Sequence, residues 1–216
     1  MSRDGALRTE FRAGVASIVP MLIGVIPFGL VAGVTAVAGG LGFGAAVGFS
    51  TIVFAGASQL ASIEVLSNGG TAVVAVLAAC TINLRMVLYS ASLAPYLTHE
   101  TIPRRAAIAY LMTDQAYAVS ITDWAGTGHD ASPATRARRF AFYTGAGLTL
   151  WSAWQVSTIA GALIGTSLPD SVPLTFAVPL VFLVLLIPAL STMPSVVAAS
   201  VGGAVNIANA MLLMLR

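Results

Sequence analysis

The sequence predicts an all-α integral membrane protein, a polytopic bundle of about six or seven hydrophobic segments. Of its 216 residues, 57% are hydrophobic and 8% are charged, whereas soluble domains carry roughly 25% charged residues. The mean hydropathy is +0.91, and several apolar runs reach the roughly 20 residues that a helix needs to cross a bilayer. We therefore predict a single polytopic transmembrane domain over residues 1–216, with some segments broken or re-entrant at Pro and Gly.

The composition also narrows the function. The single cysteine excludes a disulfide framework within one chain. All 10 basic residues are arginines that fall mostly in loops, and the formal charge is only +2. This pattern favours orientation in a membrane over binding of nucleic acid. No Gly-x-x-x-x-Gly-Lys-Ser/Thr loop is present, so we expect no direct use of ATP, and we expect neither a cofactor nor a metal.

The first hydrophobic segment covers residues 14–38 and follows a polar N-terminal lead over residues 1–13. The arginines of the lead predict a cytoplasmic N terminus. Pro27 and Gly29 interrupt the segment, because proline removes a backbone donor and obstructs the preceding turn. Two interpretations stay open. One is a kinked helix at a tight contact, with Gly29 and Gly33 in small-xxx-small spacing, and the other is a broken helix whose freed backbone lines a site.

The second hydrophobic run, about residues 41–66, contains a glycine followed by hydrogen-bonding side chains. Gly56 interrupts the helical pattern, and Ser58 and Gln59 come directly after it. Polar side chains in such a run often join neighbouring helices, at roughly 0.6–2 kcal/mol each. We predict a helix break at Gly56, next to Phe54.

Arg85 lies inside a third apolar run, from about residue 71 to residue 96. An arginine at the centre of a span costs roughly 2.5–3.5 kcal/mol on insertion scales, and its guanidinium cannot deprotonate. On a helix, Arg85 and Tyr89 share a face. Arg85 is either a structural residue tied to a carbonyl or a carboxylate, or an anion-binding group that lines a pathway. We favour the second, because a carboxylate follows in the next segment.

Asp114 lies in the middle of that next segment, residues 106–124. An ionisable residue there is a functional-site hypothesis by default, and Arg85 is the obvious partner. Tyr110, Asp114 and Tyr117 fall on one face at helical spacing. Asp114 would either bind a cationic group or carry protons, as a desolvated carboxyl can. The sequence does not choose between these roles.

Two polar loops that carry arginines, residues 97–105 and residues 125–139, flank this segment. The positive-inside rule places both loops in the cytoplasm, whereas a full span between them would separate them. One resolution is that residues 106–124, or the region around residues 41–66, enter and leave on the same side. Within the second loop, Ser132-Pro133 has the residue types of an N-cap followed by the first residue of a helix.

The remaining chain contains a span over residues 140–166 and a long apolar stretch. The span has a polar notch at Gln155 and Thr158. Residues 176–215 are apolar throughout and carry prolines, with a predicted hairpin at residues 191–194.

Four short motifs follow one another along the chain. They are Ile26-Pro27-Phe28-Gly29, Phe54-Ala55-Gly56-Ala57-Ser58-Gln59, Asn83-Leu84-Arg85 with the following Tyr89-Ser90-Ala91-Ser92, and Thr113-Asp114-Gln115. Their order and spacing resemble the AzlC-type branched-chain amino-acid permeases, over nearly the whole chain. Members of that family often have His where this chain has Met86, and Glu where it has Gln115. If either group carries protons in relatives, the coupling differs here.

The resemblance implies the large subunit of an exporter of branched-chain amino acids in the bacterial inner membrane. Its substrates would be leucine, isoleucine and valine, with methionine as a further candidate. It also implies a partner, a small AzlD-type membrane protein encoded separately, so that part of the pathway would lie between the subunits. The sequence is compatible with a homo-oligomer as well.

A branched-chain amino acid is a zwitterion with an apolar side chain, so its site needs an anion binder, a cation binder and an apolar pocket. We expect Arg85, with exposed helix N-termini at the predicted breaks, to bind the carboxylate. Asp114, with nearby amide oxygens, would bind the ammonium group. The predicted polar contacts are Arg85, Asp114, Asn83, Gln59, Ser58 and Tyr89, the apolar contacts are Phe28 and Phe54, and the broken-helix backbone is at Pro27, Gly29 and Gly56.

Other function classes fit less well. An intramembrane enzyme would need a nucleophile with a base, paired aspartates or a metal cluster. Both histidines lie in polar loops, and Asp114 and Asp123 are more than two helical turns apart, so we predict no enzyme. A non-transporting scaffold explains the glycines but not two mid-span charges. An importer or a channel for another small zwitterion stays an alternative, because these residues do not encode direction.

Overall fold

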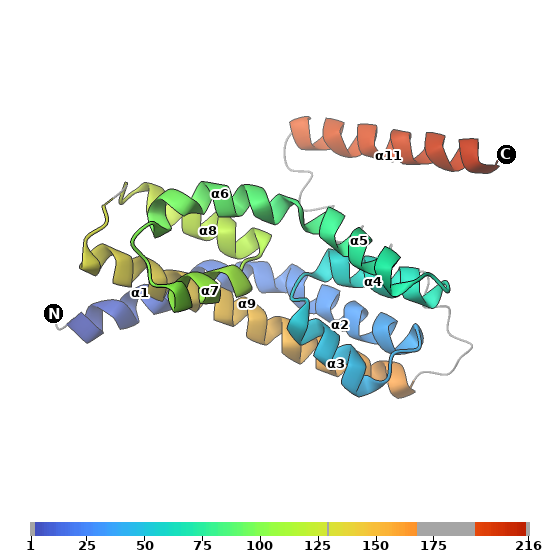
Figure 1. Cartoon of the computed structure of the whole chain (residues 1–216), viewed down its shortest axis with the longest axis horizontal. Helices are drawn as coiled ribbons and strands as arrows, with labels where there is room; N and C mark the ends of the chain where they lie inside the picture. Colours follow the sequence, from blue (N-terminus) through green and yellow to red (C-terminus); the bar gives the residue numbers. More distant parts are fainter. Residues whose placement is uncertain (1–2, 129, 168–192, 215–216) are drawn as a thin grey trace. The chain divides into compact units, whose positions relative to one another are not determined.

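The computed structural model describes residues 3–128, 130–167 and 193–214, and this part of the chain is almost wholly helical, without strands. The predicted all-α class is confirmed for these residues. The chain divides into two compact units, residues 1–174 and residues 175–216, which we describe separately. The helices of the first unit are α1 (Arg3–Ile18), η1 (Val19–Met21), α2 (Leu22–Ala38), α3 (Phe43–Ile52), α4 (Gly56–Ser67), α5 (Ala72–Asn83), α6 (Arg85–Leu97), α7 (Ile102–Tyr110), α8 (Asp114–Ala125) and α9 (Pro133–Ser167) (Figure 1).

One stretch of the described chain has the length and composition of a membrane-crossing helix. It is Asp4–Ala38, which joins α1, η1 and α2 into 35 residues. Most of the polar N-terminal lead predicted over residues 1–13 is helical, because α1 begins at Arg3. The helices α5 and α6 would make a second crossing if their 43° bend lies within one span.

The helix break predicted at Pro27 and Gly29 is wrong. Helix α2 runs through both residues without interruption. The alternative interpretation, a tight packing contact, is the correct one. A Cβ atom at Gly29 would lie 2.7 Å from the Cβ of Ser157, and one at Gly33 would overlap the carbonyl oxygen of Thr158. Packing against α9 holds α2 helical although proline removes one hydrogen bond.

Helices α1 and α2 lie parallel along α9, and glycines on both sides bring the backbones together. A Cβ at Gly14 would overlap the carbonyl of Phe142, and a Cβ at Gly161 would overlap the carbonyl of Leu30. Residue numbers rise together along the two contacting helices, so they run in the same direction. Small residues that permit such close approach are the usual interface residues of membrane helices. These three helices form the framework of the first unit.

Helices α3 and α4 form a hairpin that starts and finishes at the same end of this framework. At about 1.5 Å per residue, their 10 and 12 residues are about 15 and 18 Å long. Gly39, directly after α2, is within contact distance of Ile63 and Ser67 on α4. The chain thus returns to where α3 began. The predicted break at Gly56 is confirmed, because α4 begins there.

Helices α7 and α8 form a second hairpin, of 9 and 12 residues. Residues 106–124 are therefore not one continuous helix, and Tyr110 and Asp114 belong to different helices, so their predicted common face is wrong. The hairpin fits the alternative that this region enters and leaves on the same side. Helix α8 starts at Asp114 because the Oγ1 of Thr113 accepts a hydrogen bond from the Ala116 N–H, at 3.2 Å. A threonine that caps the first turn in this way fixes a helix start.

The helices are interrupted a third time between α5 and α6, after the breaks between α3 and α4 and between α7 and α8. Helix α5 ends at Asn83 and α6 begins at Arg85, with a bend of 43° at Leu84. Arg85 is thus the first residue of a helix rather than a residue in the middle of one. The predicted common face of Arg85 and Tyr89 is confirmed, because both lie on α6.

The two arginine-bearing connections lie together at one end of the first unit. Glu100 forms ion pairs with Arg104, at 3.3 Å, and with Arg136, at 3.1 Å. The start of α1 joins them, because Arg138 donates a hydrogen bond from Nε to Glu10 at 2.8 Å. We call this the arginine end; it comprises the start of α1, the α6–α7 connection and the α8–α9 connection (Figure 1).

The polar loop predicted over residues 125–139 is shorter than expected. Helix α9 begins at Pro133, so its first two turns carry Arg136 and Arg139. The N-cap expectation at Ser132 is confirmed, because its Oγ accepts a hydrogen bond from the Thr135 N–H at 3.3 Å. The connection turns at Gly128, whose φ of 58° suits a residue without a Cβ.

The second unit contributes one described helix, α11 (Met193–Met214). Much of the apolar stretch predicted over residues 176–215 lies outside the described residues, up to residue 192. The hairpin predicted at residues 191–194 also falls largely there. Helix α11 starts at Met193, with Pro194 in its first turn, where proline is tolerated.

Candidate functional site

The three helix interruptions of the first unit meet. Asn83 at the end of α5 donates a hydrogen bond from Nδ2 to the Ser58 Oγ on α4, at 3.0 Å. Arg85 at the start of α6 lies 2.9 Å from the carboxylate of Asp114 at the start of α8. The Tyr110 hydroxyl at the end of α7 donates to the carbonyl oxygen of α3 residue Thr51, at 2.8 Å. We call the ends of α3 to α8 that meet here the junction.

The predicted partnership of Arg85 and Asp114 is confirmed as a contact. Their side chains are 40% and 37% exposed, and the Tyr89 hydroxyl donates to the second carboxylate oxygen of Asp114 at 2.8 Å. A helix N-terminus attracts anions and repels cations. The start of α8 therefore suits Asp114. Arg85 lies between the C-terminus of α5 and the N-terminus of α6, whose dipoles act on it in opposite directions, so Asp114 is its main electrostatic support.

Tyr117 braces this ion pair, although it was not among the predicted site residues. Its ring stacks on Tyr89 with 4.3 Å between the centroids. Its hydroxyl donates to the Ser92 Oγ at 2.9 Å. The two contacts hold α6 and α8 side by side, and the stacking fixes the orientation of the Tyr89 ring. The i, i+3 spacing of Asp114 and Tyr117 on α8 was the available sequence signal.

Several buried polar atoms at the junction have no partner within the described part of the chain. Gln59 is fully buried, and neither its amide nitrogen nor its amide oxygen is hydrogen-bonded. The Oδ1 of Asn83 and the Nε of Arg85 are also buried and unpaired. These are four of the seven such atoms among the described residues. Buried polar atoms need a partner, so this group is suited to a polar ligand or to water.

Aromatic side chains cover the start of α4. The rings of Phe28 and Trp154 meet edge to face, with centroids 5.4 Å apart. A Cβ at Gly56 would lie 2.7 Å from each ring, so only glycine fits between them. Phe54 is almost buried beside the break. The structure thus places Phe28, a predicted apolar contact, beside the break at Gly56, whereas Trp154 was not among the predicted contacts, because tryptophan in a span also serves as an interface anchor.

A buried polar network joins the end of α3 to α9. The Trp154 indole donates to the Ser50 Oγ at 2.9 Å, and the Ser50 hydroxyl donates to Thr158 at 3.3 Å. Gln155 donates to the Ser50 carbonyl at 3.3 Å. The polar notch predicted at Gln155 and Thr158 thus lies against α3. Unlike the amide of Gln59, these groups are paired, and they hold one side of the junction in place.

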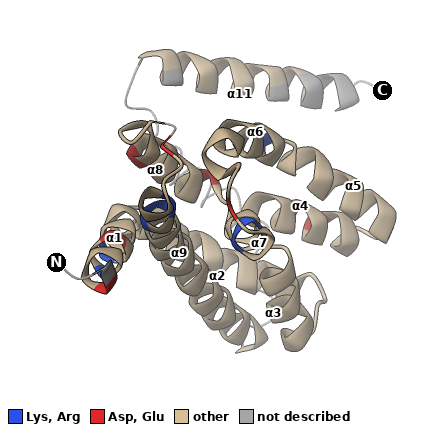
Figure 2. Cartoon of the chain, turned by 60° about the vertical axis from the view of Figure 1, so that its left-hand side comes forward, with Lys and Arg blue, Asp and Glu red and all other residues tan. Residues whose placement is uncertain are grey.

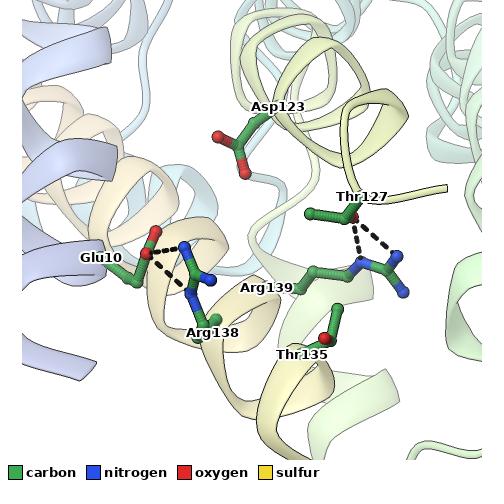
Figure 3. A pocket seen from close by; sticks show the side chains of 6 residues that line it. All are labelled: Glu10, Asp123, Thr127, Thr135, Arg138 and Arg139. Carbon is green, nitrogen blue, oxygen red and sulfur yellow. Dashed lines mark hydrogen bonds and ion pairs between the residues drawn. The ribbon is translucent and has the colours of Figure 1, made fainter. Parts of the chain in front are cut away.

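A separate small pocket lies at the arginine end. It is lined by Glu10, Asp123, Thr127, Thr135, Arg138 and Arg139 (Figure 3). Its volume of about 20 Å³ admits a water molecule and excludes an amino acid. Arg139 donates to the carbonyls of Gly128, at 2.6 Å, and Asp130, at 2.9 Å. This guanidinium therefore closes the end of α8 and has a structural role.

Comparison with known proteins identifies the family. The model of the AzlC protein family matches residues 20–168, a range that contains all three helix interruptions. The chain belongs to the AzlC family. The family resemblance read from the four motifs is thereby confirmed.

Two relatives of this AzlC family member are named as membrane proteins. The inner membrane protein YgaZ of Escherichia coli (strain K12) is 28% identical over 181 residues, which cover 80% of this chain and 70% of YgaZ. An uncharacterized membrane protein of Archaeoglobus fulgidus is 32% identical over 202 residues, covering 92% of this chain and 84% of the relative. No solved structure matches. The chain is thus a member of a membrane-protein family.

Proposed function

We propose that this chain is the large subunit of a secondary transporter that exports branched-chain amino acids across the bacterial inner membrane. The observation that carries the proposal is the Arg85–Asp114 ion pair at the meeting point of three helix interruptions. Charges within apolar segments are expensive and mark substrate pathways. Secondary transporters bind their substrates where discontinuous helices meet, and this chain has two hairpins that enter from opposite ends. Membership of the AzlC family supports the same class.

The Arg85–Asp114 ion pair suits a zwitterion, because each of the two side chains has an oppositely charged partner both before and after the zwitterion binds. In the empty site, Arg85 and Asp114 neutralise each other at 2.9 Å. An amino acid that enters between them gives its carboxylate to Arg85 and its ammonium group to Asp114. Neither side chain is left as an uncompensated charge during this exchange, which would otherwise cost several kcal/mol.

The unpaired amides next to the pair would complete the polar contacts. Gln59 offers both a donor and an acceptor, and Asn83 offers its Oδ1. A site whose buried polar groups are paired only by substrate rejects analogues that lack the matching group, by roughly 10⁴ or more in favourable cases. The rings of Phe28 and Trp154 at the start of α4 would contact the apolar side chain. This assignment predicts preference for an intact amino acid over its amine or its acid.

The remaining parts of the proposal come from the family. We propose a polytopic arrangement in the membrane and a small AzlD-like subunit as partner, with part of the pathway between the two chains. An importer or a channel for another small zwitterion, or a non-transporting scaffold, is the alternative function, and a homo-oligomer is compatible with each of them. Asp114 is assigned to the ammonium group, because it already holds the Arg85 guanidinium and a tyrosine hydroxyl.

The test is efflux of leucine, isoleucine, valine and methionine from preloaded cells that produce this chain with and without the small partner. Arg85→Ala and Asp114→Asn are the site variants. Glu64→Gln is the control, since Glu64 is an exposed carboxylate on α4, away from the junction. We expect export by the wild type and the control, and at least a tenfold loss in both site variants, with all proteins present in the membrane.

Two results would contradict the proposal separately. Export that survives both Arg85→Ala and Asp114→Asn would support the proposed function but rule out the proposed site. Absence of export of all four amino acids would rule out branched-chain amino acids as the substrate class. Exchange of internal for external substrate distinguishes the two roles of Asp114, because a proton carrier can be neutralised without loss of exchange, whereas an ammonium ligand cannot.

A further inference from the structure

The charged residues of the first unit are distributed unevenly between its two ends. Eight of the ten arginines belong to α1, α7 and the first two turns of α9. Figure 2 shows these helices coloured by charge, whereas α2, α3 and α5 contain no charged residue. The connections at the opposite end, residues 39–42 and residues 68–71, are also uncharged. The unit therefore has a basic end and a neutral end.

Four arginines of the arginine end bind groups of the protein itself. Glu100 pairs with Arg104 and Arg136, Glu10 pairs with Arg138, and Arg139 binds backbone carbonyls. Three further arginines are exposed and make no hydrogen bond or ion pair with the described part of the chain. They are Arg8, Arg12 and Arg105.

Exposed apolar side chains accompany these three guanidinium groups. Phe11 lies between Arg8 and Arg12 in the sequence of α1 and is 38% exposed. Ile102, one turn before Arg105 on α7, is 82% exposed. Arginines beside exposed apolar residues are typical of a surface at the boundary of headgroups and acyl chains. The guanidinium groups then meet phosphate while the apolar side chains enter the acyl layer.

We infer that the arginine end lies at the cytoplasmic leaflet and that Arg8, Arg12 and Arg105 bind anionic phospholipid headgroups there. The inference rests on the proposed membrane arrangement. Arginine-rich connections stay on the cytoplasmic side, and each basic residue near an anionic leaflet contributes roughly fivefold in affinity. The start of α1 and the two connections of the arginine end meet through Glu100 and Glu10, so their arginines favour the same orientation of the chain in the membrane.

Sidedness is tested first, in the full chain within native membranes. The exposed Cys80 is replaced by alanine, and single cysteines are introduced as Arg105→Cys, Ala131→Cys and Asn68→Cys. We expect a membrane-impermeant maleimide to label the first two only in inverted vesicles and the third only from the outside. Labelling of Arg105→Cys from outside, or of Arg105→Cys and Ala131→Cys from different sides, overturns the inference. Export is not measured, so this result is independent of the proposed transport.

Lipid binding is tested on the full chain reconstituted in phosphatidylcholine containing spin-labelled phosphatidylglycerol or spin-labelled phosphatidylcholine. We expect selectivity for the anionic lipid in the wild type and in an Arg→Lys triple variant at positions 8, 12 and 105. The corresponding Arg→Gln triple variant should lose at least fivefold of this selectivity. Unchanged selectivity in the glutamine variant overturns the lipid contact. A control with Glu64→Gln, at the neutral end, should leave the selectivity as in the wild type.

Discussion

The Asp114 carboxylate lies 2.9 Å from the Arg85 guanidinium, and each of the two residues is the first of its helix. The helix dipoles support the two residues unequally. The N-terminus of α8 stabilises Asp114, whereas the C-terminus of α5 and the N-terminus of α6 act on Arg85 in opposite directions. Asp114 is therefore stabilised without Arg85, whereas Arg85 depends on Asp114.

This asymmetry predicts unequal effects of two neutralising substitutions. Asp114→Asn leaves Arg85 without a charged partner and without net support from the helix dipoles, and it should lower stability by about 1–2 kcal/mol. Arg85→Gln leaves Asp114 at a favourable helix start and should cost about 0.5 kcal/mol. Thermal unfolding of the purified full chain in one detergent measures both. A larger loss for Arg85→Gln would contradict this account of the pair.

Tyr89→Phe tests whether the orientation of the Asp114 carboxylate matters for substrate. The substitution removes the hydroxyl that donates to Asp114 at 2.8 Å but keeps the ring that stacks on Tyr117. A hydrogen bond to a charged group is worth about 1.5–3 kcal/mol, so we expect KM for export to rise about tenfold with a smaller change in maximum rate. Tyr117→Phe is the matched control, since its hydroxyl donates to Ser92 instead. Equal effects of the two variants would argue against a role for the carboxylate orientation.

The glycine contacts between α2 and α9 predict a graded series. A Cβ at Gly161 would overlap a backbone carbonyl, which cannot move aside alone, so Gly161→Ala should cost about 3 kcal/mol. At Gly165 the closest atom would be 3.2 Å away, and we expect an intermediate loss. Gly44 in α3 has nothing within 4 Å, so Gly44→Ala should stabilise by about 0.5–1 kcal/mol. Thermal unfolding that gives another order would remove close backbone approach as the explanation.

Glu100 is predicted to be the most important carboxylate for the stability of the arginine end. Its side chain is only 3% exposed and pairs with two arginines from different helices. Glu100→Gln leaves both partners uncompensated, and we expect a loss of about 2 kcal/mol, since those partners are partly solvated. Glu10→Gln breaks a single ion pair, which is more exposed than those of Glu100, and the substitution should cost below about 1 kcal/mol. Chemical unfolding at low and high salt distinguishes the two variants, because only the stability loss of Glu10→Gln should become smaller at high salt.

Asp130 predicts a pH dependence at the start of α9. Hydrogen bonds from Thr135 and Ser132 hold the pKa of this exposed carboxyl below its usual value. Its stabilising contribution is therefore complete above the unfolded pKa, about 4, and is lost as the pH falls through the lower folded pKa. Hydrogen exchange of residues 132–136, corrected for the intrinsic rate, should lose protection in this acid range. Asp130→Asn should show reduced protection already at neutral pH, and no acid step of this kind.

The contact between Arg85 and Asp114 could be predicted from the sequence, because charges in apolar segments need partners. The helix break at Gly56 could be predicted as well. Both predictions depend on the free-energy cost of a single residue in its local setting. A guanidinium in hydrocarbon and a glycine in a helix are each unfavourable unless another interaction compensates them.

The remaining interruptions were missed because neither Pro nor Gly marks them. Leu84 bends the chain between α5 and α6 without any recognisable signal. The start of α8 did carry one, a threonine cap followed by an acidic residue, Thr113-Asp114. Pro27 gave the opposite error. Its local preference predicts a break, but contact of α2 with the glycines of α9 overrides it.

The parallel glycine contact between α2 and α9 ties the protein to the thickness of its bilayer. In the proposed membrane arrangement, residues 14–38 would be about 38 Å long at 1.5 Å per residue, against a hydrocarbon core of about 30 Å. A stretch longer than the core is accommodated by tilting, by kinking or by local thickening of the bilayer. Because backbones in contact cannot tilt independently, α2 and α9 must lean together. A thinner or thicker membrane would thus rotate both at once, and with them the entrances of the two hairpins that the framework carries.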